Sequence, residues 1–281
     1  MDSHTIHRLE EILSTKMDKV DILAGGSDGR TYLLQTLEQT KYIFKTDIPQ
    51  LITVQCDYYK KYKHLPYLPK LIYESPQKDE IIISFLLQNK NLDYDKYQIL
   101  TELINNYISK YKTIESDMFG FKSGFIVGRT FSEFLIAQTK ESYGYITDVF
   151  NSDDLKMTIN LIRSTYSHKN YEQKYLLHGD LGFHNLYYTK NSITGIIDPD
   201  PIIGHPLYDL VFAYCSTPKE ITLFRFKQLL ILLSQTYKID LNFSREYLLI
   251  GLFKRISSCR KHHPKDLPEY LQLWKAIIKA L

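Results

Sequence analysis

The chain has 281 residues, of which 44% are hydrophobic and 24% charged, so it is long and apolar enough to bury a substantial core. A formal net charge of +3 is too small for the clustered basic surface of a protein that binds nucleic acid or an anionic membrane. Abundant tyrosine (23) and phenylalanine (14) argue against an intrinsically disordered chain.

The cysteines and the first residues indicate the compartment. Cys56, Cys215 and Cys259 are widely separated and form no C-x-x-C pair, which predicts neither a disulfide framework nor a zinc ribbon. The N-terminus lacks a basic segment followed by an apolar core, and no uncharged run approaches the ~20 residues that cross a bilayer. We therefore expect a cytoplasmic protein without membrane contact.

The first ninety residues predict an antiparallel sheet with one helix. Two short strands are expected over residues 32–37 and 42–45, joined by a polar turn. A helix follows around residues 50–63, and two more β-rich runs, 71–73 and 81–85, flank a Ser75-Pro76 turn.

The remaining residues predict helices. Apolar side chains recur at helical spacing from residue 99 to residue 111, and Asp93 or Asp95 is suited to cap that helix. A capping box opens another helix at Thr130, and further helices are expected over residues 155–166, 220–237 and 245–281. The chain therefore reads as an α+β protein with a β-rich lobe over residues 1–90 and a helical lobe over residues 91–281.

One segment inside the helical half contains residues that could bind a metal ion and accept a proton. It reads His-Gly-Asp-Leu-Gly-Phe-His-Asn over residues 178–185 and leads into two short strands that end at Asp198. The residues before and after a hairpin lie at the same end, so Asn185 and Asp198 are expected close together, with Asp180 facing both. A carboxylate and an amide oxygen suit magnesium, and a second carboxylate can receive a hydroxyl proton.

The spacing of this segment fits the kinase catalytic loop, H-R-D-L-x-x-x-N, which is followed by a metal-binding aspartate. With the Ile-Ile-Asp that ends at Asp198 and the Gly-His-Pro-Leu-Tyr-Asp-Leu of residues 204–210, the chain resembles the aminoglycoside phosphotransferase family of small-molecule kinases. Gly179, where protein kinases usually have arginine, favours that family. The resemblance is strongest over residues 175–215 and weaker over 22–90.

The resemblance implies a two-lobed, protein-kinase-like fold and an enzyme that uses ATP and Mg²⁺ to phosphorylate a hydroxyl group of a small molecule. Asp180 would be the catalytic base, and Asn185 and Asp198 would bind magnesium. The supporting residues would be His178 in the loop, Asp209 bracing the loop from the following helix, and Asp200 assisting at the metal. The family often has an acid where this chain has His205, which puts the local bracing of the loop in doubt.

The resemblance also assigns nucleotide contacts to the first lobe. Lys45, at the end of a predicted strand, would hold the ATP phosphates. A glycine segment expected ahead of the first strand would approach the phosphates through Gly26, Ser27 and Gly29, and Ser84 and Leu86 would form the hinge that meets adenine. The acid that partners Lys45 is not evident; the helix near residues 50–63 offers Gln55 and Asp57, of which Asp57 is favoured.

Two other functions remain to be weighed. The histidines and aspartates of residues 178–185 also suit a metallophosphoesterase, but no further ligand motifs are evident. The glycine segment is irregular, and the helix near residues 50–63 lacks the glutamate expected to pair with the lysine in a kinase. Both features leave room for a catalytically weak or inactive nucleotide-binding module. The basic side chains of the C-terminal helices are expected to form a solvated face, or else to meet a phosphate or carboxylate on the acceptor. For a kinase they favour a neutral or anionic acceptor over a polycationic aminoglycoside; they are Lys254, Arg255, Arg260, Lys261, His262, His263 and Lys265.

Overall fold

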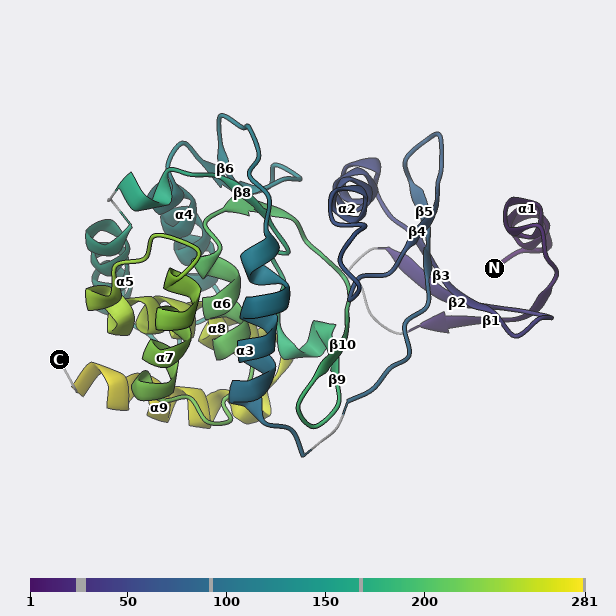
Figure 1. Cartoon of the computed structure of the whole chain (residues 1–281). Helices are drawn as coiled ribbons and strands as arrows, with labels where there is room; N and C mark the ends of the chain where they lie inside the picture. The colour runs from purple at the N-terminus through teal and green to yellow at the C-terminus, as the bar shows by residue number, and fades with distance from the viewer. Residues whose placement is uncertain (24–28, 91–92, 167–168, 280–281) are drawn as a thin grey trace. The chain divides into compact units, whose positions relative to one another are not determined.

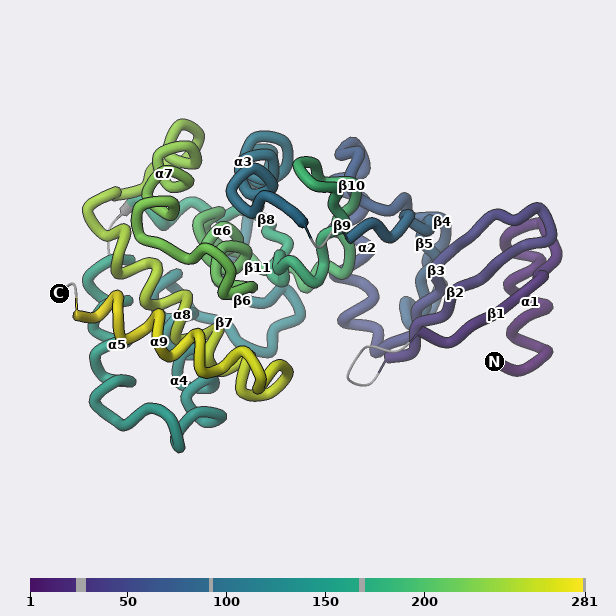
Figure 2. Tube along the Cα trace, turned by 90° about the horizontal axis from the view of Figure 1, so that it is seen from below, coloured from purple at the N-terminus to yellow at the C-terminus, as the bar shows by residue number. Residues whose placement is uncertain are grey.

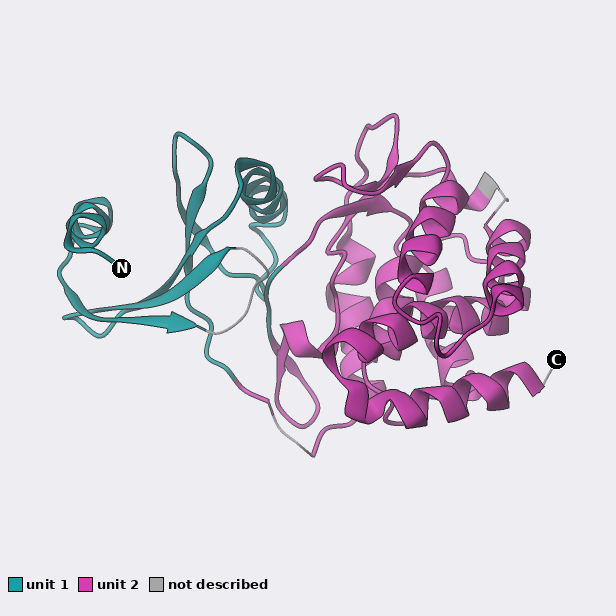
Figure 3. Ribbon diagram, turned by 180° about the vertical axis from the view of Figure 1, so that it is seen from behind, with its two compact units in different colours: residues 1–88, 195–198 teal, residues 89–194, 199–281 magenta. Residues whose placement is uncertain are grey.

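The computed structural model describes residues 1–23, 29–90, 93–166 and 169–279. The chain divides into two compact units (Figure 3). Unit 1 comprises Met1–Gln88 and Gly195–Asp198, and unit 2 comprises Asn89–Thr194 and Pro199–Leu281.

Unit 1 is a five-stranded antiparallel sheet with two helices, and its strand order is β1-β2-β3-β5-β4 (Figure 1). Its elements are α1 (Ser3–Leu13), β1 (Met17–Leu23), β2 (Arg30–Thr36), β3 (Lys41–Thr46), α2 (Pro49–Lys61), β4 (Leu71–Glu74) and β5 (Glu80–Ser84). The four strands and the helix expected from the sequence are all present. Helix α1 and strand β1 were not predicted, so the glycine segment follows the first strand and does not precede it.

The core of unit 1 lies between α1 and the sheet. Leu9 of α1 is fully buried against Tyr32, Leu34, Phe44 and Ile82 from three strands. Figure 2 shows α1 against the end of the sheet that holds β1 and β2. Burial of these apolar side chains is the main force that holds the helix on the sheet.

Unit 2 is mainly helical. Its α-helices are α3 (Lys96–Asn106), α4 (Phe131–Tyr143), α5 (Ser152–Thr165), α6 (Leu207–Cys215), α7 (Leu223–Ser234), α8 (Ser244–His262) and α9 (Leu267–Lys279). Short 3₁₀ turns are η1 (Ile108–Lys110), η2 (Lys169–Tyr171), η3 (Phe183–Asn185), η4 (Leu241–Phe243) and η5 (Pro264–Asp266). Helix α8 packs against α4, α5, α6, α7 and α9. The helix expected over residues 245–281 is thus two helices, because the chain turns at Pro264, whose ring cannot continue a helix.

Helix starts follow the capping residues of the sequence. Asp95 accepts a hydrogen bond from the backbone of Gln98 at 3.0 Å and starts α3. Thr130 and Glu133 form the expected capping box of α4.

Two small sheets complete the fold. Strands β7 (Val127–Gly128), β6 (Phe119–Phe121), β11 (Ile202–Gly204) and β8 (Tyr175–Leu177) form a four-stranded sheet in that order. Strands β9 (Leu186–Tyr188) and β10 (Ile193–Ile196) pair as the expected hairpin. No helix in the described ranges is both long and apolar enough to span a bilayer.

Candidate active site

The loop that carries Asp180 joins β8 to η3 and has a backbone that only glycine allows at residue 179. Gly179 has φ +84°, and a β-carbon built on it would lie 1.8 Å from the carbonyl oxygen of Asp200. The backbone nitrogen of Asp200 in turn donates to the carbonyl oxygen of His178 at 2.9 Å. The loop and the segment after Asp198 are therefore in direct backbone contact, which no larger residue at position 179 permits.

Asp180 is held by its own loop. The side-chain nitrogen Nδ2 of Asn185 donates to Oδ2 and to the backbone oxygen of Asp180, both at 2.9 Å, and Nε2 of His184 lies 3.2 Å from Oδ2. Burial opposes ionisation, but the hydrogen bond to His184 and the charge of nearby cations hold the pKa of Asp180 below its ordinary value. Asp180 is therefore a fixed carboxylate at neutral pH.

Asp209 of α6 holds this loop in place by accepting hydrogen bonds from its backbone. Its Oδ2 accepts the backbone N–H of His178 at 2.9 Å and the hydroxyl of Tyr111 at 2.5 Å, while Oδ1 accepts the N–H of Gly179 at 3.0 Å. Asp209 is fully buried, and burial raises its pKa to about 6. The side chain makes the contacts expected of a residue that braces the catalytic loop.

His205 does not take part in this bracing. It is buried, and its Nδ1 accepts the N–H of Leu207 at 3.2 Å at the start of α6. Burial lowers the pKa of His205 to about 3, so the ring is neutral. The loop thus has its acidic contact in Asp209, and the neutral ring at residue 205 supplies none.

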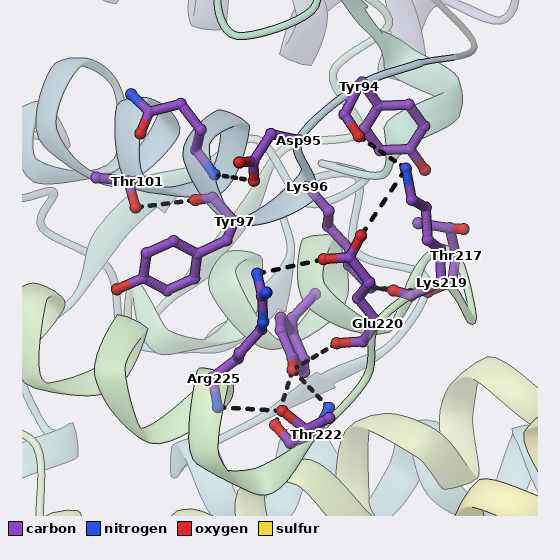
Figure 4. A network of polar contacts seen from close by, with 12 residues as sticks. Tyr94, Asp95, Lys96, Tyr97, Thr101, Thr217, Lys219, Glu220, Thr222 and Arg225 are labelled. Carbon is purple, nitrogen blue, oxygen red and sulfur yellow. Dashed lines mark hydrogen bonds and ion pairs between the residues drawn. The ribbon is translucent and has the colours of Figure 1, made fainter.

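A second group of contacts fixes the other end of the loop. The backbone N–H of Phe183 donates to the hydroxyl of Ser216 at 3.0 Å, and the Phe183 ring lies 5.2 Å from that of Tyr94. The chain after Ser216 is held against the start of α3, because the Lys96 ammonium donates to the carbonyls of Thr217 and Lys219 at 2.9 and 2.7 Å (Figure 4). These contacts limit movement of η3, which contains Asn185.

Asp200 and Lys254 add charge beside Asp180. Burial and the negative charge of Asp180 raise the pKa of Asp200 to about 6. Burial lowers the pKa of Lys254 to about 8, although the carboxylates of Asp180 and Asp200 oppose that change. The expectation that Lys254 belongs to a solvated face was wrong: its ammonium lies 4.4 and 4.9 Å over the rings of Tyr208 and Phe212. The basic residues from Arg260 to Lys265 are exposed.

Unit 1 contains the other two charged residues singled out in the sequence. Lys45 of β3 forms an ion pair with Asp198, which follows β10. Asp198 adopts the left-handed backbone conformation with φ +55°. The buried side chain of Tyr59 on α2 lies close to the Asp198 carboxylate, whose charge helps to raise the pKa of the tyrosine after burial itself. The sequence suggested an acid of α2 as the partner of Lys45; the partner that the structure shows is Asp198, which sequence spacing gave no means to find.

The remaining nucleotide-site candidates lie along the sheet of unit 1. A β-carbon on Gly29 would lie 2.7 Å from the backbone oxygen of Thr46, so this position also favours glycine. Ser84 ends β5 and accepts the N–H of Lys70 at 2.8 Å, and Leu86 follows it half-buried. Gly26 and Ser27 lie outside the described residues.

The chemistry of the donor set fits magnesium. The Asn185 amide donates through nitrogen to Asp180, which leaves its oxygen as a potential ligand, and Asp198 offers a half-exposed carboxylate. Both are hard oxygen donors of the kind that hold magnesium on nucleotide phosphates. Within the described ranges, no three His, Cys, Asp or Glu side chains gather as a metal cluster.

Comparison of the sequence with protein-family profiles and with curated proteins finds no match. Comparison with solved structures finds matches over nearly the whole chain. A putative fructosamine-3-kinase from Haemophilus somnus 129PT matches with a TM-score of 0.64 and 15% identity, covering 99% of this chain and 96% of that chain.

Aminoglycoside phosphotransferases match over similar lengths. A thermostable mutant of aminoglycoside phosphotransferase APH(4)-Ia has a TM-score of 0.60 and 15% identity, covering 98% of both chains. The streptomycin and ATP complex of APH(2")-IIa has a TM-score of 0.58 and 16% identity, covering 97% of this chain and 96% of that chain. The expected fold class is confirmed: the chain has the kinase-like α+β fold of the aminoglycoside phosphotransferases and fructosamine-3-kinase.

Proposed function

We propose that the chain is a phosphotransferase that moves the γ-phosphate of ATP to a hydroxyl group of a small molecule, such as a sugar, an amino alcohol, an amino acid or an aminoglycoside-like compound. The observation that carries the proposal is the Asp180 carboxylate, ionised and bonded by Asn185 in a loop that Asp209 locks in place. The solved structures of the same fold include complexes with ATP, ADP, AMP-PNP and hygromycin B, which supports a nucleotide and a small hydroxyl-bearing acceptor as ligands.

In the proposed reaction, Asp180 orients the acceptor hydroxyl and receives its proton as the new oxygen–phosphorus bond forms. The bond between the γ-phosphorus and the β,γ-bridging oxygen breaks in the same step, and ADP leaves with that oxygen. A carboxylate with a lowered pKa is a weak base, which suffices because phosphoryl transfer depends mainly on positioning and charge stabilisation. The loop geometry is fixed before substrate binds, so little reorganisation is needed at the moment of transfer.

The first ninety residues would hold the nucleotide. Lys45 would exchange part of its contact with Asp198 for the ATP phosphates, and the backbone near Gly29 and the hinge at Ser84 and Leu86 would contact the rest of the nucleotide. Asn185 and Asp198 would each give an oxygen to magnesium, with Asp200 nearby in the chain. Bound magnesium would neutralise charge on the transferred phosphoryl group.

The test is a phosphorylation assay with the purified chain, ATP and MgCl₂ across a panel of alcohols, with products detected by mass spectrometry. The proposal expects at least one phosphorylated alcohol, formed together with ADP and lost when EDTA is added. If ATP binds but neither ADP nor any phosphorylated alcohol forms, the chain is a non-catalytic nucleotide-binding module instead.

A further inference from the structure

Lys254 of α8 is a desolvated cation that has no directly bound acid. Its ammonium donates to the hydroxyl of Tyr208, a neutral group, because burial raises the pKa of Tyr208 well above its ordinary value. Across the described part of the chain, no carboxylate oxygen lies within 4.0 Å of the Lys254 ammonium nitrogen. The ammonium is partly buried, and the carboxylates of Asp180, Asp200 and Asp209 act on it only through their charge. None of the described carboxylates forms a hydrogen bond with it, so an anion of a ligand can take that place.

The ammonium is held rigidly. The amide nitrogen of Gln138 on α4 donates to the Tyr208 hydroxyl at 3.0 Å, which fixes the acceptor of Lys254. The rings of Tyr208 and Phe212 stack at 6.5 Å and lie beneath the lysine head. A pre-positioned cation loses little entropy when it binds an anion.

The same group lies beside the proposed catalytic loop. A β-carbon built on Gly182 would lie 3.2 Å from the Phe212 ring, so the platform under Lys254 also abuts the loop between Asp180 and Asn185. Asp180 and Lys254 perturb each other's pKa through their charges. If the hydroxyl of an acceptor faces Asp180, a charged group elsewhere on that acceptor would therefore be attracted or repelled by the positive charge of Lys254.

A neighbouring cavity does not provide the acceptor site. It is lined by Lys254, Arg255 and both polar and apolar residues of α4, α6 and α8, and its volume is about 40 Å³. On this measure one water molecule needs about 10–15 Å³, so the cavity holds a few waters and is too small for an acceptor.

We infer that Lys254 binds an anionic group, a carboxylate or a phosphate, on the acceptor that Asp180 phosphorylates. The inference rests on the proposed function and narrows its substrate class to hydroxy acids and phosphorylated alcohols. An anion would accept the charge-assisted hydrogen bond that no described carboxylate takes from Lys254, whereas a polycationic acceptor is repelled by the ammonium. An ammonium binds a carboxylate and a phosphate through the same kind of contact, so the experiment must include acceptors of both kinds to show which anion is bound.

The experiment measures kcat/KM for matched acceptors: gluconate against sorbitol, glycerol 3-phosphate against glycerol, and kanamycin as a polycation. Wild-type protein is expected to prefer at least one anionic member over its neutral partner, and the pair that shows the preference identifies carboxylate or phosphate. Lys254→Met keeps the apolar stem and should lower the anionic-to-neutral ratio about 10- to 100-fold, as expected for loss of a charged hydrogen bond. Lys254→Arg should restore most of the ratio.

The matched control is Lys261→Met, the same change two turns further along α8, at an exposed lysine over the Tyr145 ring. This control should leave the ratio unchanged. Preference for sorbitol, glycerol or kanamycin, or an equal ratio in Lys254→Met and wild type, would overturn the inference while leaving the kinase proposal intact. If no acceptor is phosphorylated, the kinase proposal has failed, and calorimetry then measures binding of the same pairs to wild type and to Lys254→Met. Equal affinities for the two proteins would overturn the inference. Selective loss of anion binding in Lys254→Met would uphold it.

Discussion

Lys45 and Asp198 form an ion pair although 153 residues separate them in the sequence. The lysine side chain is 13% exposed and the aspartate 49% exposed, so the pair is open to solvent on the acid's side. Both belong to unit 1, into which the Gly195–Asp198 segment is incorporated. The proposed phosphate-binding lysine and a proposed magnesium ligand are therefore already joined before nucleotide binds.

Replacing Lys45 by methionine should lower kcat/KM for ATP about 10- to 100-fold, because a charge-assisted hydrogen bond to phosphate is lost while the apolar stem remains. Initial-rate kinetics at varied ATP concentration measure this change. Lys19→Met is the control, since Lys19 is an exposed lysine of β1 that pairs with the nearby Asp21 in the same strand. Equal ATP kinetics for Lys45→Met and Lys19→Met would remove Lys45 from the nucleotide site.

Gly179→Ala should destabilise the protein much more than Gly124→Ala. Both glycines have positive φ, +84° and +87°, so both substitutions carry a backbone penalty of about 1 kcal/mol. Only Gly179 also faces a backbone oxygen, whereas a β-carbon on Gly124 meets nothing within 4 Å. Urea denaturation followed by circular dichroism should show an excess loss of about 2 kcal/mol or more for Gly179→Ala. Similar losses for both variants would mean that the close contact of residue 179 with Asp200 is not maintained in solution.

His205 should make folding stability depend on pH in acid. Its pKa is about 3 in the folded protein and near 6.5 when unfolded, so between these values the unfolded chain binds a proton that the folded chain does not. The contribution of His205 is complete above pH 6.5 and is lost as pH falls toward 3, by about 1.4 kcal/mol per pH unit.

His205→Asn tests this dependence, because asparagine keeps an acceptor for the Leu207 N–H and does not titrate. The urea midpoint of wild type should fall more steeply than that of His205→Asn between pH 6 and pH 4. Parallel curves would contradict the assignment of a neutral buried imidazole.

The proposed catalytic loop and its hairpin could be predicted because their residues are neighbours in the sequence. Asp180 and Asn185 are five residues apart, and the strand pattern after Asn185 was sufficient to place the hairpin. The contact between Asp209 and the loop was expected from the family resemblance, and the structure now supplies its donors, the backbone of His178 and Gly179.

Other features depend on contacts between distant segments. Strand β1 escaped prediction because a register shift between Met17 and Lys19 breaks its alternation. Lys254 looks like its exposed neighbours in the sequence, and only packing of α8 against α4 and α6 reveals that it is desolvated. Local patterns carry no information on such burial.

The central claim is that Asp180 receives the proton of an acceptor hydroxyl, and Asp180→Asn tests it most directly. Asparagine keeps the shape of the side chain but cannot act as a base, so single-turnover transfer of phosphate to a validated acceptor should slow by about 10²- to 10⁴-fold. ATP affinity, measured by calorimetry on the same sample, should stay within threefold of wild type, by our estimate of about 0.6 kcal/mol or less. Transfer at the wild-type rate by Asp180→Asn would contradict the account.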